Sequence, residues 1–167
     1  YLDIPTVTGT ENLMTAAVLA EGKTVLRNAA REPEVTALAD VLNQMGARVE
    51  GAGTSIITIK GVSSLNPVSV RIIPDRIEAG TFMAAAVLTR GCIKLLGCDP
   101  GHLEAVIHKL RLTGATIDVD GSTIRTTGPE NIASVDVKTK EYPGFPTDMQ
   151  AQFMVLMSVA KGLSIIS

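Results

Sequence analysis

The sequence predicts an α/β fold built from a repeated unit of strand, helix, strand, helix, strand and strand. A proline precedes a strongly apolar helix at three places, at Pro5, Pro74 and Pro146. The prolines lie 69 and then 72 residues apart, so the 167 residues hold two units and part of a third. Solenoid and propeller repeats are shorter, roughly 20–50 residues, so each copy is expected to be a small α/β unit.

Each unit is expected to open on a short alternating strand, at residues 2–4, 68–73 and 135–138. In the first unit a helix follows at residues 11–20, and because it is apolar on nearly every side it is predicted to be buried. A strand at 24–28 and a helix from Pro33 to Gln44 come next, and Gly46 ends that helix. Residues 48–50 and 55–59 flank a glycine-rich turn, which indicates a hairpin.

The second unit, residues 68–127, repeats this order with its first helix at 80–88. Buried helices with strands outside them predict a barrel-like α/β body. The segment at 63–67 is short and rich in turn-forming residues, so a domain boundary is predicted near residues 67–74.

Composition excludes several classes of protein. The chain is 46% hydrophobic but only 3% aromatic, so Ala, Val, Leu, Ile and Met must pack the core. A net charge of −2 without a basic run argues against nucleic acid or an anionic membrane as the main partner. The longest apolar stretch is about eight residues against the roughly 20 of a membrane helix, so a cytoplasmic protein without an export or spanning segment is expected.

The cysteines and histidines do not predict a metal site. Cys92 and Cys98 follow Gly91 in a segment that alternates like a buried strand, and both are interpreted as small core residues. His102 and His108 are six residues apart, whereas a shared helix face needs three or four.

Candidate chemistry lies at helix starts. Residues 5–10 combine a helix N-terminus, threonine hydroxyls and a glycine, a pattern that suits phosphate binding. On spacing alone, however, the pattern favours the simpler interpretation that Thr8 or Thr10 only caps the helix. Asp75 and Asp148 occupy similar positions, and N-capping competes there with catalysis. The acidic segment at Glu32 suits the first turn of a helix, because the positive end of the helix dipole favours negative charge there.

Taken together, four segments are far more specific than any one of them. Residues 8–14, 28–34, 74–82 and 145–152 occur in the order and spacing of the UDP-N-acetylglucosamine 1-carboxyvinyltransferase family, a family of enolpyruvyl transferases. The chain resembles that family from end to end. The family's proteins are more than twice as long, so the chain is expected to be an internal piece with N- and C-terminal parts missing.

The resemblance implies two domains, each an inside-out α/β barrel, with the active site in the cleft between them. Residues 1–73 would be the last unit of one barrel, and residues 74–167 the first unit and the start of the next unit of the other. It also implies the transfer of enolpyruvate from phosphoenolpyruvate to the 3-hydroxyl of UDP-N-acetylglucosamine, with release of phosphate. This is the first committed step of peptidoglycan biosynthesis, and it needs no cofactor.

The resemblance also implies roles for particular residues. The carboxylate matching Asp148 is the proposed base for the sugar hydroxyl, and residues matching Glu32 and Asp75 line the cleft. Residues that match the UDP-sugar contacts are Ile4, Pro5, Thr6, Val7 and Thr8. Because some family members have lysine where this chain has Ile4, backbone N–H groups are the expected donors to the diphosphate here.

Other parts of the family's machinery have no match within these residues. They are a loop cysteine, a Lys-Asn pair and the phosphate-binding arginines; Cys92 and Cys98 do not match the loop cysteine. The chain alone is therefore expected to be inactive.

Two alternatives stay open. One is an enolpyruvyl transferase that acts on shikimate 3-phosphate, although the four segments match the UDP-sugar family better. The other is a non-catalytic repeat module that binds RNA. The acidic balance and the scarcity of aromatic stacking residues argue against this alternative.

Overall fold

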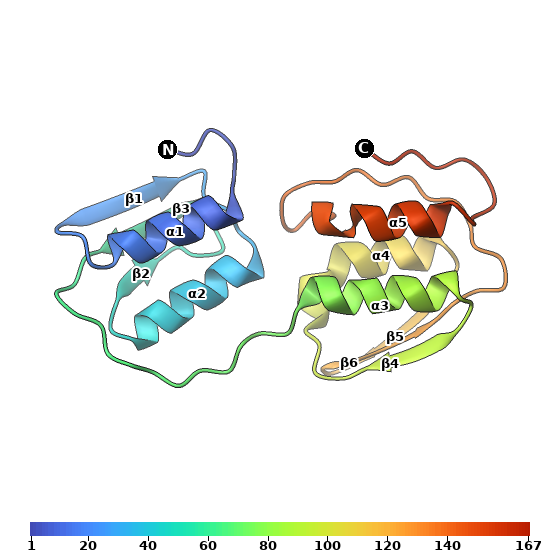
Figure 1. Ribbon diagram of the computed structural model, residues 1–167, viewed down its shortest axis with the longest axis horizontal. Helices are drawn as coiled ribbons and strands as arrows, with labels where there is room; N and C mark the ends of the chain where they lie inside the picture. The colour runs from blue at the N-terminus through green and yellow to red at the C-terminus, as the bar shows by residue number, and fades with distance from the viewer. The chain divides into compact units, whose positions relative to one another are not determined.

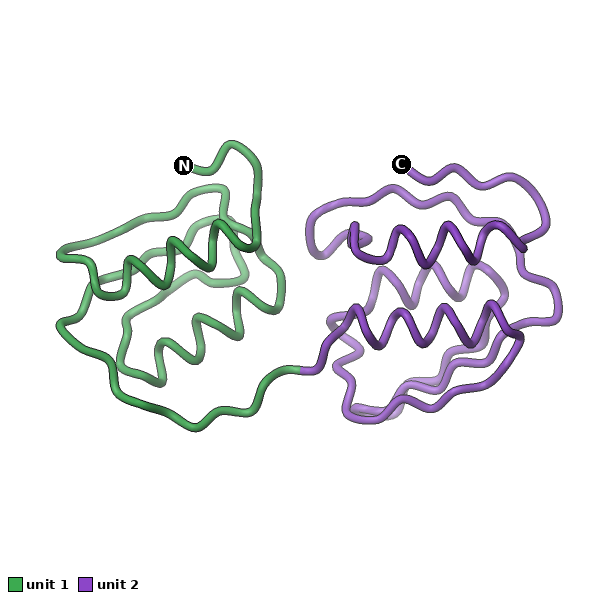
Figure 2. The backbone as a smooth tube through the Cα atoms, in the orientation of Figure 1, with its two compact units in different colours: residues 1–73 green, residues 74–167 purple.

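The chain forms two compact α/β units. The computed structural model describes all 167 residues, and the units are Tyr1–Ile73 and Pro74–Ser167 (Figure 2). Each unit has its own hydrophobic core.

Unit 1 is a three-stranded antiparallel sheet with two helices on one face (Figure 1). The strand order is β1-β3-β2, with Val25 opposite Thr58 and Val49 opposite Ile59. In chain order the elements are α1 (Val7–Ala17), β1 (Lys23–Arg27), α2 (Pro33–Gln44), β2 (Arg48–Glu50) and β3 (Ile56–Lys60).

The core of unit 1 follows from the periods of these elements. On β3, Ile57 and Ile59 are fully buried while Ile56 is exposed, as a sheet with one covered face requires. The Asn43 side chain accepts from the Val49 N–H and donates to the Val49 carbonyl, both at 2.8 Å, which fixes the turn from α2 into β2. The larger buried helix residues are Met14, Val35 and Leu42.

Unit 2 repeats this topology and adds one helix. Its sheet has the order β4-β6-β5, again antiparallel throughout. The elements are α3 (Arg76–Leu88), β4 (Cys92–Leu95), the 3-10 turn η1 (Pro100–Leu103), α4 (Glu104–Leu112), β5 (Thr116–Asp120), β6 (Thr123–Thr127), the 3-10 turn η2 (Thr147–Met149) and α5 (Gln150–Met157). The predicted repeat is confirmed, since helix, strand, helix, strand, strand occurs twice.

Helix α5 packs against α3 (Figure 1). The Phe145 and Phe153 rings meet edge to face with centroids 4.8 Å apart, and both side chains are buried. Between the helices the Gln152 side-chain amide donates to the Thr81 hydroxyl at 2.9 Å.

The prediction of an opening strand in each unit is wrong, because none of the three segments forms a β-strand. Residues 68–73 pair with nothing, residues 2–4 contribute one backbone bond from Leu2 N–H to the Arg27 carbonyl, and Val137 forms only an isolated parallel bridge with Ile166. Alternation alone does not make a strand, because its N–H and C=O groups need a neighbouring ladder.

The first helix of each unit starts four residues before the predicted position. Thr6 and Asp75 are the N-caps, so Gly9 and Gly80 lie inside helices. The prediction that the helix at 11–20 is buried on all sides is also wrong here, since Leu13 is 46% exposed while the opposite side of α1 is buried.

The core interpretation of the cysteines is wrong for Cys92. This residue is exposed on β4, an edge strand, and Cys98 is partly exposed in the turn that follows. The Thr127 hydroxyl, 3.4 Å from Cys92 Sγ, lowers the pKa of that thiol, whereas burial raises the pKa of Cys98. None of the helices is both long and apolar enough to cross a membrane.

Candidate functional site

The start of α1 is capped by Thr6 and not by Thr8 or Thr10. The Thr6 hydroxyl accepts from the Gly9 N–H at 3.2 Å, and Thr8 is exposed in the first turn. A Cβ on Gly9 would lie 2.5 Å from the Thr6 methyl carbon, so this glycine makes room for the cap rather than for a ligand. The N–H groups of Val7 and Thr8 have no partner within the helix, as at any helix start, and Ile4 beside them is 73% exposed.

Thr10 has a different role from the predicted one. It is fully buried, and its hydroxyl accepts from the Ala30 N–H at 3.1 Å. This bond joins α1 to the segment that leads into α2. It therefore sets the position of Glu32 relative to α1.

Three glutamates gather where α1 meets the start of α2. Glu32 occupies the N-cap position of α2, but its side chain makes no capping bond, so the capping interpretation is wrong for it. Partial burial raises the pKa of Glu11, and the Glu34 and Glu32 carboxylates raise it further. No group of three or more His, Cys, Asp or Glu side chains is arranged to hold a metal ion.

In unit 2 the two helix-start aspartates are not equivalent. Asp75 is a true N-cap of α3, because one of its carboxylate oxygens accepts from the N–H groups of Ile77 and Glu78 at 2.8 and 3.1 Å. Asp148 is the middle residue of η2, whose N-cap position is held by Pro146, and no side-chain bond caps that turn. Capping is thus confirmed for Asp75 and wrong for Asp148.

Asp148 is an exposed carboxylate on a firmly held backbone. Phe145, three residues before it, is 4% exposed, and Met149 immediately after it is fully buried. A Cβ on Gly80 would lie 3.0 Å from the Met149 sulfur, so the missing side chain of Gly80 lets η2 approach α3 closely. The fold therefore presents the Asp148 carboxylate outward from a packed support.

The sequence-predicted residues thus fall into two groups. Ile4 to Thr8 lie at the start of α1 in unit 1, where Glu32 is joined to α1 through Thr10, whereas Asp75 and Asp148 belong to unit 2. Sequence reasoning missed the buried bond between Thr10 and Ala30, and it gave Tyr142 no role. The only sequence signal for Tyr142 was its rarity, since the chain has two tyrosines.

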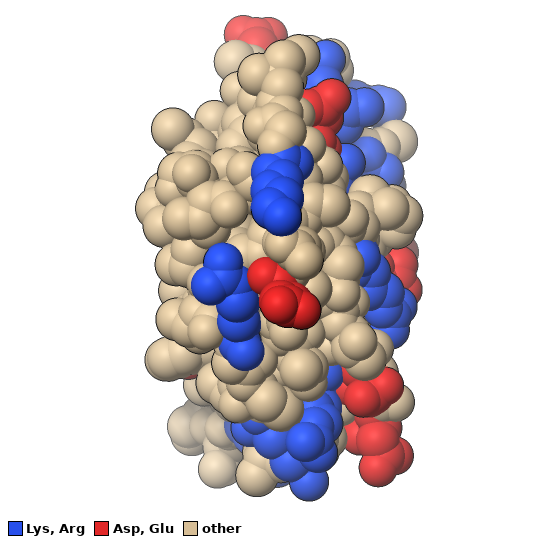
Figure 3. All heavy atoms as spheres, turned by 90° about the vertical axis from the view of Figure 1, so that its right-hand side faces the viewer, with Lys and Arg blue, Asp and Glu red and all other residues tan.

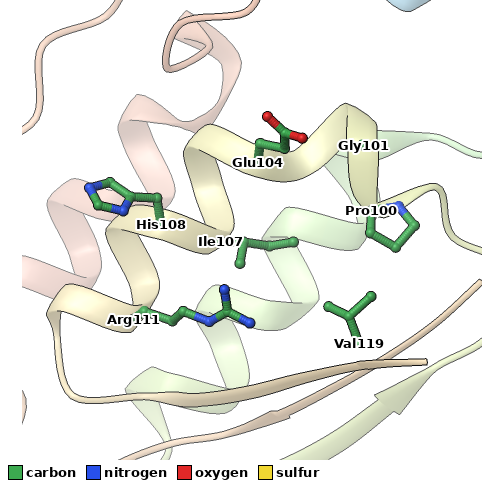
Figure 4. A pocket seen from close by; sticks show the side chains of 7 residues that line it. All are labelled: Pro100, Gly101, Glu104, Ile107, His108, Arg111 and Val119. Carbon is green, nitrogen blue, oxygen red and sulfur yellow. The ribbon is translucent and has the colours of Figure 1, made fainter. Parts of the chain in front are cut away.

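A separate open groove in unit 2 contains none of the predicted residues. It has a volume of about 280 Å³ and lies between α4 and Val119 on β5 (Figure 4). One of its charged groups is already engaged, because Arg111 donates to the Ile117 carbonyl at 2.7 Å. Its lining residues are Pro100, Gly101, Glu104, Ile107, His108, Arg111 and Val119.

Surface charge does not form one continuous patch on the face shown in Figure 3. Lys and Arg side chains stand there among Asp and Glu and broad uncharged areas.

The chain is similar to enolpyruvyl transferases over its whole length. Relatives named UDP-N-acetylglucosamine 1-carboxyvinyltransferase from Desulfatibacillum aliphaticivorans and Desulfosudis oleivorans are 66% and 67% identical over 167 residues. The relative of that name from Myxococcus xanthus is 56% identical over 165 residues. The chain spans about 40% of the length of these relatives.

Two solved structures share the fold. The enolpyruvyl transferase NikO from Streptomyces tendae matches 95% of this chain and 39% of its own with a TM-score of 0.80 and 24% identity. An EPSP synthase from Acinetobacter baumannii matches 99% of this chain and 39% of its own with a TM-score of 0.60 and 20% identity. These likenesses show that the predicted α/β fold is that of enolpyruvyl transferases.

A family model covers the chain completely. The model described as EPSP synthase (3-phosphoshikimate 1-carboxyvinyltransferase) matches residues 1–167. The chain therefore belongs to the EPSP synthase family of enolpyruvyl transferases.

Proposed function

We propose that the whole protein transfers the enolpyruvyl group of phosphoenolpyruvate to the 3-hydroxyl of UDP-N-acetylglucosamine and releases phosphate, the first committed step of peptidoglycan biosynthesis. The observation that carries this proposal is the identity of 66–67% across all 167 residues with relatives named for that reaction. Both substrates are cytoplasmic metabolites, so the proposal includes a cytoplasmic location.

The reaction defines what the protein must supply. The sugar oxygen forms a bond to C2 of phosphoenolpyruvate and loses its proton, while C3 gains a proton and becomes a methyl group. The C–O bond to phosphate then breaks, and one proton leaves that methyl group. A base for the hydroxyl, an acid for C3 and cations around the phosphate are therefore needed.

Asp148 is the proposed base. A general base must reach the proton that it removes, which requires an accessible carboxylate on a positioned backbone. The exposure of Asp148, its freedom from capping and the buried neighbours Phe145 and Met149 support this role.

The start of α1 is proposed to contact the UDP-sugar. Ile4, Pro5, Thr6, Val7 and Thr8 are the proposed contacts, with the N–H groups of Val7 and Thr8 as donors to the diphosphate at the positive end of the helix dipole. Because Thr6 already accepts from Gly9, its hydroxyl proton remains available to a ligand oxygen. Glu32 and Asp75 are proposed to line the cleft as supporting residues.

This chain is proposed to be an internal piece of a two-domain protein. Residues 1–73 would complete one barrel and residues 74–167 would begin the other. The acid for C3 and the phosphate-binding cations would then come from the N- and C-terminal parts of the same protein, which are its proposed partners in addition to the two substrates.

The second candidate function is enolpyruvyl transfer to shikimate 3-phosphate. The observation that favours it is the description of the family model, which names 3-phosphoshikimate 1-carboxyvinyltransferase. Both functions use the same donor and release the same product, so the acceptor distinguishes them.

The test uses the full-length protein with phosphoenolpyruvate and each acceptor in turn. We expect phosphate release with UDP-N-acetylglucosamine and none above background with shikimate 3-phosphate, together with thermal stabilisation by the UDP-sugar alone. Turnover with shikimate 3-phosphate only would replace the first proposal by the second. Absence of turnover with both acceptors would reject both.

A further inference from the structure

Arg76 is a buried cation in an unusual place. It is the first residue of α3 after the Asp75 cap and is only 9% exposed. The N-terminal end of a helix carries the positive end of the dipole, where a cation is disfavoured, and burial of a charge adds a further cost. The rest of unit 2 must therefore provide contacts that compensate for this placement.

Tyr142 provides one such contact. The guanidinium carbon of Arg76 lies 5.6 Å from the centroid of the Tyr142 ring, within the range of a cation–π interaction. The Tyr142 hydroxyl in turn donates to the Gly101 carbonyl on η1 at 3.4 Å. The tyrosine is thus held from α3 and from η1, and the cavity between these groups, about 10 Å³, is too small for a substrate.

The segment that carries Tyr142 is a closed loop, residues 140–145, which we name the Tyr142 loop. The Lys140 N–H donates to the Phe145 carbonyl at 2.9 Å, and the Gly144 N–H donates to the Glu141 carbonyl at 2.8 Å. A Cβ on Gly144 would lie 2.6 Å from the Lys140 Cβ, so the loop closes tightly on itself. Its last residue is the buried Phe145, and Asp148 follows three residues later.

We propose that Arg76 and Tyr142 are positioning residues for Asp148. The contact between them fixes the Tyr142 loop on α3, and the loop fixes the point from which η2 and its carboxylate leave. This inference rests on the proposed role of Asp148 as the base. A displacement of about 1 Å in a reacting group can lower a rate by about 100-fold, so a loosened loop would be visible in turnover.

The test measures kcat and KM of the full-length protein and of four variants. We expect Arg76→Met and Tyr142→Leu to lower kcat by about 10-fold or more with KM for the acceptor changed by less than about threefold, because they displace the base and not the binding groups. Tyr142→Phe keeps the ring over the guanidinium and should retain kcat within about threefold. Arg90→Met is the matched control, since Arg90 follows the other end of α3 and donates to the Glu130 carbonyl.

A double-mutant cycle separates positioning from general stability. If Arg76 acts through Asp148, Arg76→Met should lower kcat in the native background and have little further effect in an Asp148→Asn background. An equal loss in both backgrounds, or unchanged kcat in both Arg76→Met and Tyr142→Leu, would overturn the proposal.

Amide hydrogen exchange tests the loop without any need for turnover. We expect the Gly144 amide to exchange faster in Tyr142→Leu than in the native protein or in Tyr142→Phe. An unchanged Gly144 exchange rate in Tyr142→Leu overturns the anchoring of the loop. A native protein without turnover would instead reject the proposed function, and with it the catalytic part of this inference.

Discussion

At the scale of single residues, Asp75 and Asp148 differ in what their oxygens already do. One carboxylate oxygen of Asp75 accepts hydrogen bonds from two backbone N–H groups of α3, whereas Asp148 makes no capping bond. The bonded oxygen of Asp75 is held against the start of α3, whereas the exposed Asp148 carboxylate makes no capping bond and can meet a substrate hydroxyl. Asp148 is therefore the better candidate for a base.

The Asp148→Ala substitution in the full-length protein tests this assignment. We expect kcat to fall by about 100-fold to 10,000-fold, the usual contribution of a general base, while UDP-N-acetylglucosamine still binds. Steady-state phosphate release and a binding titration measure the two effects. Asp120→Ala, which removes an exposed carboxylate at the end of β5, serves as the control. Near-normal kcat in Asp148→Ala would show that this residue is not the base.

Glu11 provides a prediction about pH. Its pKa is raised above the ordinary 4.5 by partial burial and by the Glu34 and Glu32 carboxylates, so the folded state holds the proton more tightly than the unfolded state. Ionisation of Glu11 therefore lowers the free energy of unfolding as pH rises from about 4.5 through the folded pKa.

Removal of this charge should stabilise the fold at neutral pH. We expect Glu11→Gln to raise the Tm by on the order of 1 °C near pH 7, a small effect because solvent screens a partly exposed group. The gain should disappear at about pH 3, well below the 4.5 of the unfolded state, where Glu11 is protonated in both states. Thermal melts at the two pH values measure it, with Glu50→Gln on β2 as the control; a gain that grows toward low pH would contradict the sign.

Residue chemistry was predictable where it is local. Asp75 follows a proline and precedes a helix, and capping depends on those few residues alone. The buried bond that the Ala30 N–H donates to Thr10 joins residues 20 positions apart, and the contact between Arg76 and Tyr142 joins residues 66 positions apart. Only tertiary folding brings these residues together. No pattern in the sequence specifies such pairs.

At the scale of elements, the caps decide where helices begin. Pro33 sets the start of α2 and Gly46, with a φ of +103°, follows its end, so both bounds of that helix were predictable. The starts of α1 and α3 were predicted four residues late, since each helix begins directly after its cap, Thr6 or Asp75. Both glycines lie within helices for reasons of contact, with the Thr6 methyl and with Met149 respectively.

The effect of Gly9→Ala on the free energy of unfolding should depend on whether residue 6 is threonine or alanine. Thr6→Ala removes the α1 cap and should lower the free energy of unfolding by about 1 kcal/mol. Gly9→Ala would gain about 1 kcal/mol of helix propensity but must displace the Thr6 side chain, so its net effect should be close to zero or unfavourable. In a Thr6→Ala background the clash is absent, and the same Gly9→Ala change should stabilise the fold. Urea unfolding of the four proteins measures this coupling, and equal effects of Gly9→Ala in both backgrounds would exclude it.

The opening strands show the limit of periodicity. Residues 68–73 alternate as well as β3 does, yet only β3 has neighbours on both sides. Alternation reports which face of a segment can be buried, whereas pairing depends on a partner strand elsewhere in the fold. The fold class was therefore predictable, but the strand content was not.

At the scale of the whole molecule, apolar side chains remain uncovered in both units. Leu13 of α1 is 46% exposed, Phe82 of α3 is 48% exposed, and Met154 and Val155 of α5 are 55% and 54% exposed. These residues lie on helices that the sequence marks as apolar on most sides, and a helix of that kind is normally buried. In the proposed barrels, units from the rest of the protein would cover these side chains. The chain spans about 40% of the length of its relatives.

The final prediction concerns the 167-residue chain in isolation. We expect it to release no phosphate from phosphoenolpyruvate and UDP-N-acetylglucosamine, because it contains the proposed base, whereas the acid for C3 and the cations that stabilise the leaving phosphate are proposed to lie in the rest of the protein. We also expect it to bind an apolar fluorescent dye more strongly per mole than the full-length protein, since the exposed helix faces would be covered there. The full-length protein under the same conditions is the positive control for both measurements. Phosphate release by the isolated chain above a sample without protein would show that these residues hold the complete catalytic machinery, and equal dye binding would remove the support for the covering units.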